Sequence, residues 1–74
     1  MSKCVLVNVI NRMIYVEQYN SVNEAWTEIE NEFCRFCEDN DLSIGYDCAI
    51  SYNTLSAWAN GSYDCIDWMI HRID

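Results

Sequence analysis

The chain begins with two apolar stretches that a polar pair separates. The first, CVLVNVI, is rich in β-branched residues and apolar at nearly every position, a pattern typical of an inner strand. The second, MIYVEQY, follows the pair Asn11-Arg12. Because Asn tolerates positive φ angles, this pair can form the two-residue turn of a hairpin. The pattern predicts a β-hairpin with strands near residues 3–10 and 13–19.

An apolar period of 3.6 residues follows in residues 21–39. Its start, Ser21-Val22-Asn23-Glu24, is a capping box, in which the Ser hydroxyl accepts a hydrogen bond from the backbone N–H of Glu24. The apolar positions after it are 22, 25, 26, 29, 33, 36 and 37, which fall on one side of a helix. We therefore expect an amphipathic helix over residues 21–39 that ends before Asn40-Asp41.

The last third of the chain predicts three short strands. YDCAISY alternates, LSAWAN is compatible with a short strand, and Asn60-Gly61 is a hairpin signal. The segment CIDWMIHRI fits a helix or a strand, and we prefer the strand because β-branched and aromatic residues dominate it. The predicted fold class is α+β, a small antiparallel sheet in the order ββαβββ with one amphipathic helix packed on one face.

Length and charge narrow the classes of function. The 74 residues predict a single compact domain, residues 1–74, with a thin core. Twelve Asp and Glu against four Lys and Arg give a net charge of −8, which argues against direct binding of nucleic acid or of an anionic membrane. A small protein of this charge is attracted to proteins that bind nucleic acid. The alternative is that the acidity only keeps the chain in solution.

The cysteines and the first apolar run bear on the compartment. The run from Cys4 to Ile10 is too short for a transmembrane helix, and no small-residue cleavage site follows it, so we expect no signal peptide. Five cysteines are an odd number and favour reduced thiols over a disulfide framework. These features predict a cytoplasmic protein.

A Cys-x-x-Cys raises the question of a metal site. Cys34 and Cys37 have the spacing of half a zinc site, which Cys48, Cys65 or His71 could complete. On the helix projection Cys37 lies on the apolar side, whereas Cys34 points about 60° away from it, toward solvent. A redox role is disfavoured because the motif lies near the negative end of the helix dipole. We therefore expect no metal and no cofactor, with a small Cys-ligated zinc protein as an alternative.

Catalytic residues are not predicted. Cys65, Asp67 and His71 would share one side of a strand, yet no glycine-rich oxyanion or phosphate loop accompanies them. The chain is expected to be non-enzymatic.

The distribution of carboxylates is more informative. Seven of the twelve lie in residues 21–41, where Glu24, Glu28 and Glu32 recur every four residues and form one ridge along the helix. Like charges at this spacing destabilise a helix, and only Arg35 offers local relief. Exposed Trp and Tyr side chains are favoured anchors of interfaces. The candidate protein-binding residues are Glu24, Glu28, Glu32, Glu38, Asp39, Asp41, Tyr63 and Trp58.

The end of the chain carries a resemblance. The stretches AWAN (residues 57–60) and DWMI (residues 67–70), joined by a Gly-containing turn, are similar to the endings of small acidic proteins encoded by bacteriophages. The resemblance implies an inhibitor of the anti-defence type, anti-CRISPR proteins included, that acts in the host cytosol. Some such inhibitors imitate the charge of DNA. The implied partner is the basic surface of a host protein or nucleoprotein complex.

The sequence therefore predicts a non-enzymatic acidic protein-binding module that acts through the carboxylate-rich helix. A structural module that forms a homodimer through an exposed edge strand or an aromatic face is the main alternative.

Overall fold

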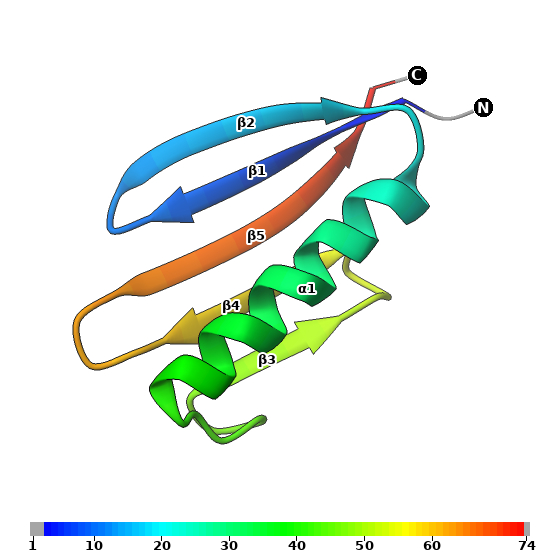
Figure 1. The fold of residues 1–74 in the computed structure, drawn as a ribbon. Coiled ribbons are helices and arrows are strands. Elements are labelled where there is room, and N and C mark those ends of the chain that lie inside the picture. The colour runs from blue at the N-terminus through cyan, green and yellow to red at the C-terminus, as the bar shows by residue number, and fades with distance from the viewer. Residues whose placement is uncertain (1–2, 74) are drawn as a thin grey trace.

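The computed structural model describes residues 3–73. Its elements are β1 (Cys4–Ile10), β2 (Met13–Tyr19), α1 (Val22–Asn40), β3 (Cys48–Ser51), β4 (Ser56–Asn60) and β5 (Cys65–Arg72). The predicted α+β class and the order ββαβββ are confirmed, and so is the strand at the C-terminal end. Figure 1 shows α1 lying across the sheet.

The sheet has the strand order β2-β1-β5-β4-β3, and every neighbouring pair is antiparallel. β5, the last strand in sequence, therefore lies between β1 and β4 near the centre. It pairs with β1 along the whole of that strand, from Cys4 opposite Arg72 to Ile10 opposite Ile66. β1 therefore has a hydrogen-bonded strand on each edge, as predicted for an inner strand.

Local signals place the first hairpin and the helix as predicted. Asn11 and Arg12 both adopt positive φ angles, 49° and 75°, which the two-residue turn requires. The Ser21 hydroxyl accepts a hydrogen bond from the backbone N–H of Glu24 at 3.2 Å and caps the helix. The helix ends where Asp41 takes a left-handed conformation with φ 54°.

The second predicted hairpin is also present, but its turn is longer than two residues. Asn60 is the last residue of β4, and the turn comprises residues 61–64, closed by a 2.8 Å hydrogen bond from the N–H of Gly61 to the carbonyl of Asp64. Gly61 serves a close approach: a Cβ there would lie 2.9 Å from Asn40 Oδ1 and 3.1 Å from Phe36 Cζ. This turn therefore abuts the last turns of α1.

The core lies between α1 and one face of the sheet. Along the helix the buried residues are Val22, Ala25, Ile29, Phe33 and Cys37, as the 3.6-residue period predicts. The sheet contributes Cys4, Leu6, Cys48, Ala57, Ala59, Trp68 and Ile70. The rings of Phe33 and Trp68 meet edge to face with centroids 5.9 Å apart.

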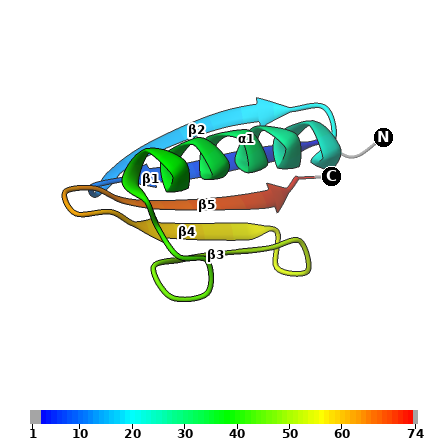
Figure 2. The same ribbon diagram turned by 60° about the horizontal axis from the view of Figure 1, so that its bottom comes forward.

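The other face of the sheet carries no further element among residues 3–73. Figure 2 shows α1 on one side of the strands and no helix on the other. Side chains therefore alternate between a packed face and an open face along each strand. None of the described helices is long and apolar enough to cross a membrane.

Candidate functional site

A groove runs between α1 and the helix-side surface of the first hairpin. α1 packs over the central strands but leaves the outer strand β2 open on this side. Tyr15 and Glu17 of β2 lie opposite Asn8 and Leu6 of β1, so their side chains point to the helix side of the sheet. Tyr15 is 50% exposed, although the neighbouring strand β1 contributes buried residues to the core on the same face. The groove thus exists because the single helix is too narrow to cover all five strands.

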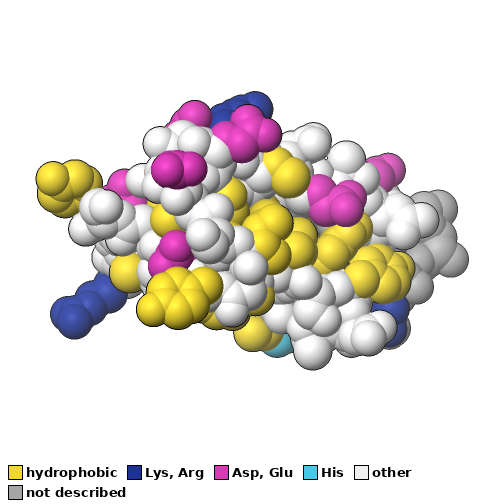
Figure 3. Space-filling model, turned by 90° about the horizontal axis from the view of Figure 1, so that it is seen from below, with side chains coloured by type: hydrophobic (Ala, Val, Ile, Leu, Met, Phe, Trp, Pro, Cys, Tyr) yellow, Lys and Arg dark blue, Asp and Glu magenta, His cyan; other side chains and the backbone are white. Residues whose placement is uncertain are grey.

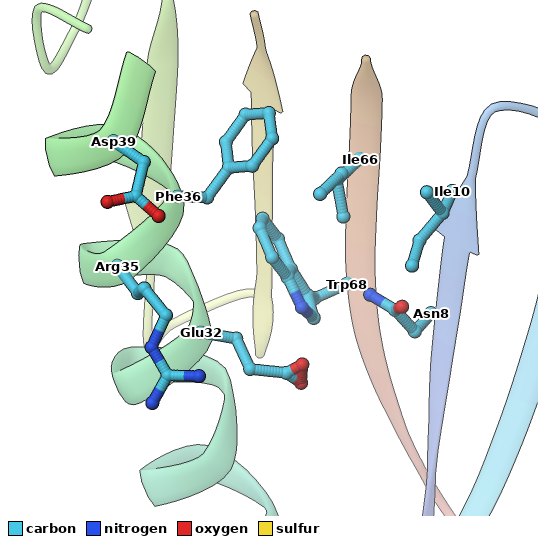
Figure 4. Close-up of a pocket in the computed structure, with 8 residues that line it drawn as sticks. All are labelled: Asn8, Ile10, Glu32, Arg35, Phe36, Asp39, Ile66 and Trp68. Carbon is cyan, nitrogen blue, oxygen red and sulfur yellow. The ribbon is translucent and has the colours of Figure 1, made fainter. Parts of the chain in front are cut away.

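The groove consists of two adjoining hollows that share Asn8 and Glu32. The first has a volume of about 220 Å³ and is lined by Asn8, Ile10, Glu32, Arg35, Phe36, Asp39, Ile66 and Trp68 (Figure 4). The second, of about 330 Å³, lies toward β2, and its lining includes Leu6, Asn8, Tyr15, Glu17 and Glu32. The floor is apolar, and carboxylates stand along its rims.

Glu32 stands at the centre of the groove. Its partial burial raises the pKa of its carboxyl group, and the nearby charges of Glu28 and Glu17 raise it further. The indole of Trp68 and the guanidinium of Arg35 lower the pKa, but they do not reverse the shift. Of the five groups and effects that act on the pKa of Glu32, the charge of Arg35 has the smallest influence. The one cation in the groove therefore leaves its negative charge largely uncompensated.

Tyr19, at the end of β2, independently shows that the carboxylates converge. Its hydroxyl donates a hydrogen bond to Glu17 Oε1 at 3.3 Å. Burial, followed by the charges of Glu17 and Glu28 and more weakly of Glu32, raises the pKa of Tyr19 to about 12. Three carboxylates from two separate elements thus act on one hydroxyl group.

Trp68 forms part of the floor and contributes an unusual polar group. The residue is 1% exposed, and its buried indole N–H has no hydrogen-bond partner among the described residues. In Figure 4 the Glu32 carboxylate points toward the indole nitrogen. The two groups attract each other electrostatically but do not reach hydrogen-bonding geometry. A buried donor without an acceptor is uncommon, so this part of the groove is incompletely satisfied in the isolated chain.

This arrangement suits a cationic side chain. The apolar floor can hold the methylene stem of a Lys or Arg, while the carboxylates on the rims take the charged head. The aromatic rings of Trp68, Tyr15 and Phe36 border the same space, and such rings attract cations.

The structure divides the predicted carboxylate ridge. Glu24 and Glu28 are exposed on α1, and Glu32 turns into the groove with Asp39. Glu38 and Asp41 lie instead on the other flank of the helix, around a separate hollow next to Cys34 and Leu42. Figure 3, a view from the β3 edge, shows acidic side chains gathered mainly on the α1 side above a band of hydrophobic ones.

The two predicted aromatic anchors do not join the ridge. Trp58 points to the open face of the sheet, since its neighbours Ala57 and Ala59 are buried against α1. Tyr63 lies in the turn between β4 and β5 and is 93% exposed. Neither residue lines the acidic groove.

Sequence reasoning missed Glu17, Tyr15 and Asn8 as groove residues. They belong to the first hairpin and are separated from the helix in sequence. The signal that could have found them is the hairpin register: it places Glu17 opposite Leu6, a core position, and hence on the helix side.

The cysteines divide as the helix projection predicts. Cys37 is buried and Cys34 is exposed. The Sγ atoms of Cys37 and Cys48 lie 3.3 Å apart in the core, where burial and the contact with Cys48 raise the pKa of the Cys37 thiol. Within residues 3–73 no three His, Cys, Asp or Glu side chains cluster as metal ligands would.

Cys65, Asp67 and His71 do share the open face of β5, as a strand requires. Asp67 and His71, however, lie about 13 Å apart along the extended chain, and Cys65 is farther still from the histidine. That separation prevents proton transfer between them, so these residues do not form a catalytic set.

The comparisons with known proteins leave the site to be interpreted from its own chemistry. No protein-family model matches this chain, and no similar protein was found among curated sequences or among solved structures.

Proposed function

We propose that this chain is a non-enzymatic protein-binding module whose acidic groove holds basic side chains of a partner that itself binds nucleic acid. Occupying such a surface keeps the phosphates of nucleic acid away from it, so the module acts as an inhibitor. The resemblance to small acidic phage proteins points to the same role, with a host defence or nucleic-acid enzyme as the target. The observation that carries the proposal is that Glu17 of β2 and Glu32 of α1 line one groove, with the charge of Glu28 acting on Glu32 from beside it.

The cost of this convergence supports a binding role. Like charges held close together destabilise the isolated fold, and Arg35 compensates them only weakly. A solvated surface would gain by placing these carboxylates apart. A guanidinium or ammonium group from a partner relieves the repulsion, and the relief adds to the free energy of binding.

The test compares two double variants with the same net charge. Glu17→Gln with Glu32→Gln removes the two carboxylates that line the second hollow of the groove, and Glu30→Gln with Glu38→Gln removes two exposed ones outside it; each pair changes the net charge from −8 to −6. The probe is a ten-residue peptide of alternating Lys and Arg, titrated by calorimetry. We expect the groove variant to bind at least about tenfold more weakly and the control to lose less than about threefold.

Equal losses in the two variants would mean that net charge alone attracts the peptide, and the groove would then have no binding role. The natural partner is sought by capture from a host lysate at low salt. Double-stranded DNA should compete with the module for a partner of the proposed kind.

A further inference from the structure

The open face of the sheet carries apolar side chains on all five strands. The strand register arranges the residues of this face in two rows across the sheet: Ile14, Val9, Asp67, Trp58 and Ala49 in one, and Val16, Val7, Met69, Ser56 and Ser51 in the other. Asp67 and the two serines are the polar members of these rows. Val5 extends the patch toward the next row, between Gln18 and His71. The patch therefore spans all five strands.

The apolar side chains of this patch are largely exposed to solvent in the isolated chain. On β2, Ile14 is 68% exposed and Val16 is 62% exposed, and Met69 of the central strand β5 is 46% exposed. β-Branched and aromatic residues on both sides of a strand are typical of sheets covered on both faces. A single sheet covered on one side does not need them.

The open face is also nearly free of the acidity that dominates the rest of the molecule. Among the strand residues that point to it, Asp67 is the one carboxylate. Glu17, the other acidic residue of the described strands, points to the helix side, and the carboxylates of α1 lie beyond the core layer. A highly acidic chain thus keeps one largely apolar face with a single strand carboxylate.

We propose that this face binds a second copy of the same chain, sheet against sheet, in a two-fold symmetric dimer. The face measures about 24 Å across the five strands and about 20 Å along them, so two copies bury about 1,000 Å² in total. That area reaches the lower limit for a specific interface and suits a dimer with a dissociation constant on the order of 10 μM.

Charge favours a second copy as the occupant. Asp67 is the one carboxylate among the strand residues of this face, so the face offers little charge for a basic partner to recognise, whereas two copies of it can match their apolar rows to each other. With sheets about 10 Å apart and a helix outside each, the α1 carboxylates of the two copies stand about 30 Å from one another, well beyond the Debye length of about 8 Å at physiological ionic strength. The net charge of −8 per chain therefore does not prevent this contact.

Such a dimer also gives the Asp67 carboxylate a neighbouring side chain on the second copy. Asp67 and His71 lie equally far from Met69 along β5. Consider a two-fold axis that lies between the two sheets, parallel to them, perpendicular to the strands and at the level of Met69. This axis brings Asp67 opposite the partner's His71. The two acidic grooves then lie on the outer sides of the dimer, so this proposal does not depend on the function of the groove.

The experiment measures self-association with two neighbouring substitutions on β2. Val16→Lys places a charge on the open face, and Met13→Lys places the same charge on the helix side of the same strand, at a position that is 61% exposed. In sedimentation equilibrium from about 1 μM to about 500 μM, we expect the natural chain and Met13→Lys to dimerise equally. Val16→Lys should weaken the dimer by at least about tenfold.

Three results would overturn the proposal. The natural chain could stay monomeric over the whole range, or both variants could dissociate equally, which indicates pairing of the β2 edges. Alternatively, Val16→Lys could leave the dimer unchanged. A measurement without substitutions completes the test: a dissolved nitroxide should broaden the methyl NMR signals of Val7 and Val9 in dilute samples but not in concentrated ones, and broadening at both concentrations contradicts a dimer through this face.

Discussion

The two faces of one sheet differ in what their apolar residues do. On β5, Trp68 and Ile70 point to α1 and are buried, whereas Met69 between them points to the open face and is 46% exposed. The covered face holds the fold together and carries the acidic groove at its margin. The open face contributes little to the stability of the isolated chain, although many of its side chains are apolar. The comparison shows that an apolar side chain stabilises a fold only where another layer covers it.

The largest expected difference between the faces is in stability. Ile70→Ala removes a buried side chain of the core and should lower the free energy of unfolding by about 3 kcal/mol. Met69→Ala, one residue earlier on the same strand, should lower it by less than about 1 kcal/mol at a concentration where the chain is monomeric. Urea denaturation at about 1 μM measures both values.

Raising the protein concentration sharpens this test. If the open face forms a dimer, the cost of Met69→Ala should grow with concentration, because unfolding is then coupled to dissociation. A cost of about 3 kcal/mol for Met69→Ala in the monomer would show that the open face is part of the core after all.

Salt should affect binding at the two faces to very different extents. Between about 50 mM and 500 mM NaCl, binding of the basic peptide to the groove should weaken by about tenfold or more, because the contact is electrostatic. Self-association through the apolar face should change by less than about twofold, since it involves few charges. Calorimetry and sedimentation at the same salt concentrations give both numbers. Parallel weakening would assign both contacts to charged surfaces.

The smallest expected effect concerns Glu32 and depends on pH. Its pKa is raised in the folded chain, so the folded state binds the proton more tightly than the unfolded state, and the ionised carboxylate destabilises the fold. This penalty is absent below the unfolded pKa near 4.5, develops as the pH rises toward the folded pKa, and is complete above it. Glu32→Gln should therefore raise Tm by about 2 °C at pH 7, a few tenths of a kcal/mol for a domain of this size, and the gain should vanish below about pH 4.5.

The matched control for this prediction is Glu30→Gln, an exposed position of the same helix outside the groove. It should leave Tm within about 1 °C at both pH values. A gain for Glu30→Gln as large as that for Glu32→Gln would show that the repulsion belongs to the whole chain and not to the groove.

Most of the secondary structure could be predicted because its signals are local. The turn at Asn11-Arg12, the cap at Ser21 and the apolar period of α1 each depend on residues within a few positions of one another. The strand order could not be predicted, since the place of β5 between β1 and β4 depends on pairings between the two ends of the chain. The hairpin after Asn60 was predicted, but the length of its turn, residues 61–64, was not, because Gly61 is needed by its contact with α1.

The candidate site was predicted only in part. The spacing of Glu24, Glu28 and Glu32 gave the ridge, since helical positions four apart lie together. The spacing could not show that Glu32 turns into a groove or that Glu17 and Tyr15 line the same groove from β2. Trp58 was grouped with the ridge from its residue type, although it lies on the other side of the sheet.

The sequence alone determined the elements, the acidic character of α1 and the separation of Cys34 from Cys37. These properties follow from short-range periods and from composition, which do not depend on how the elements assemble. The tertiary structure decided which carboxylates converge and which apolar residues have no covering layer. Both outcomes follow from one geometric fact: a single helix covers only the middle of one face of a five-stranded sheet, leaving an acidic groove at its side and an apolar face behind it.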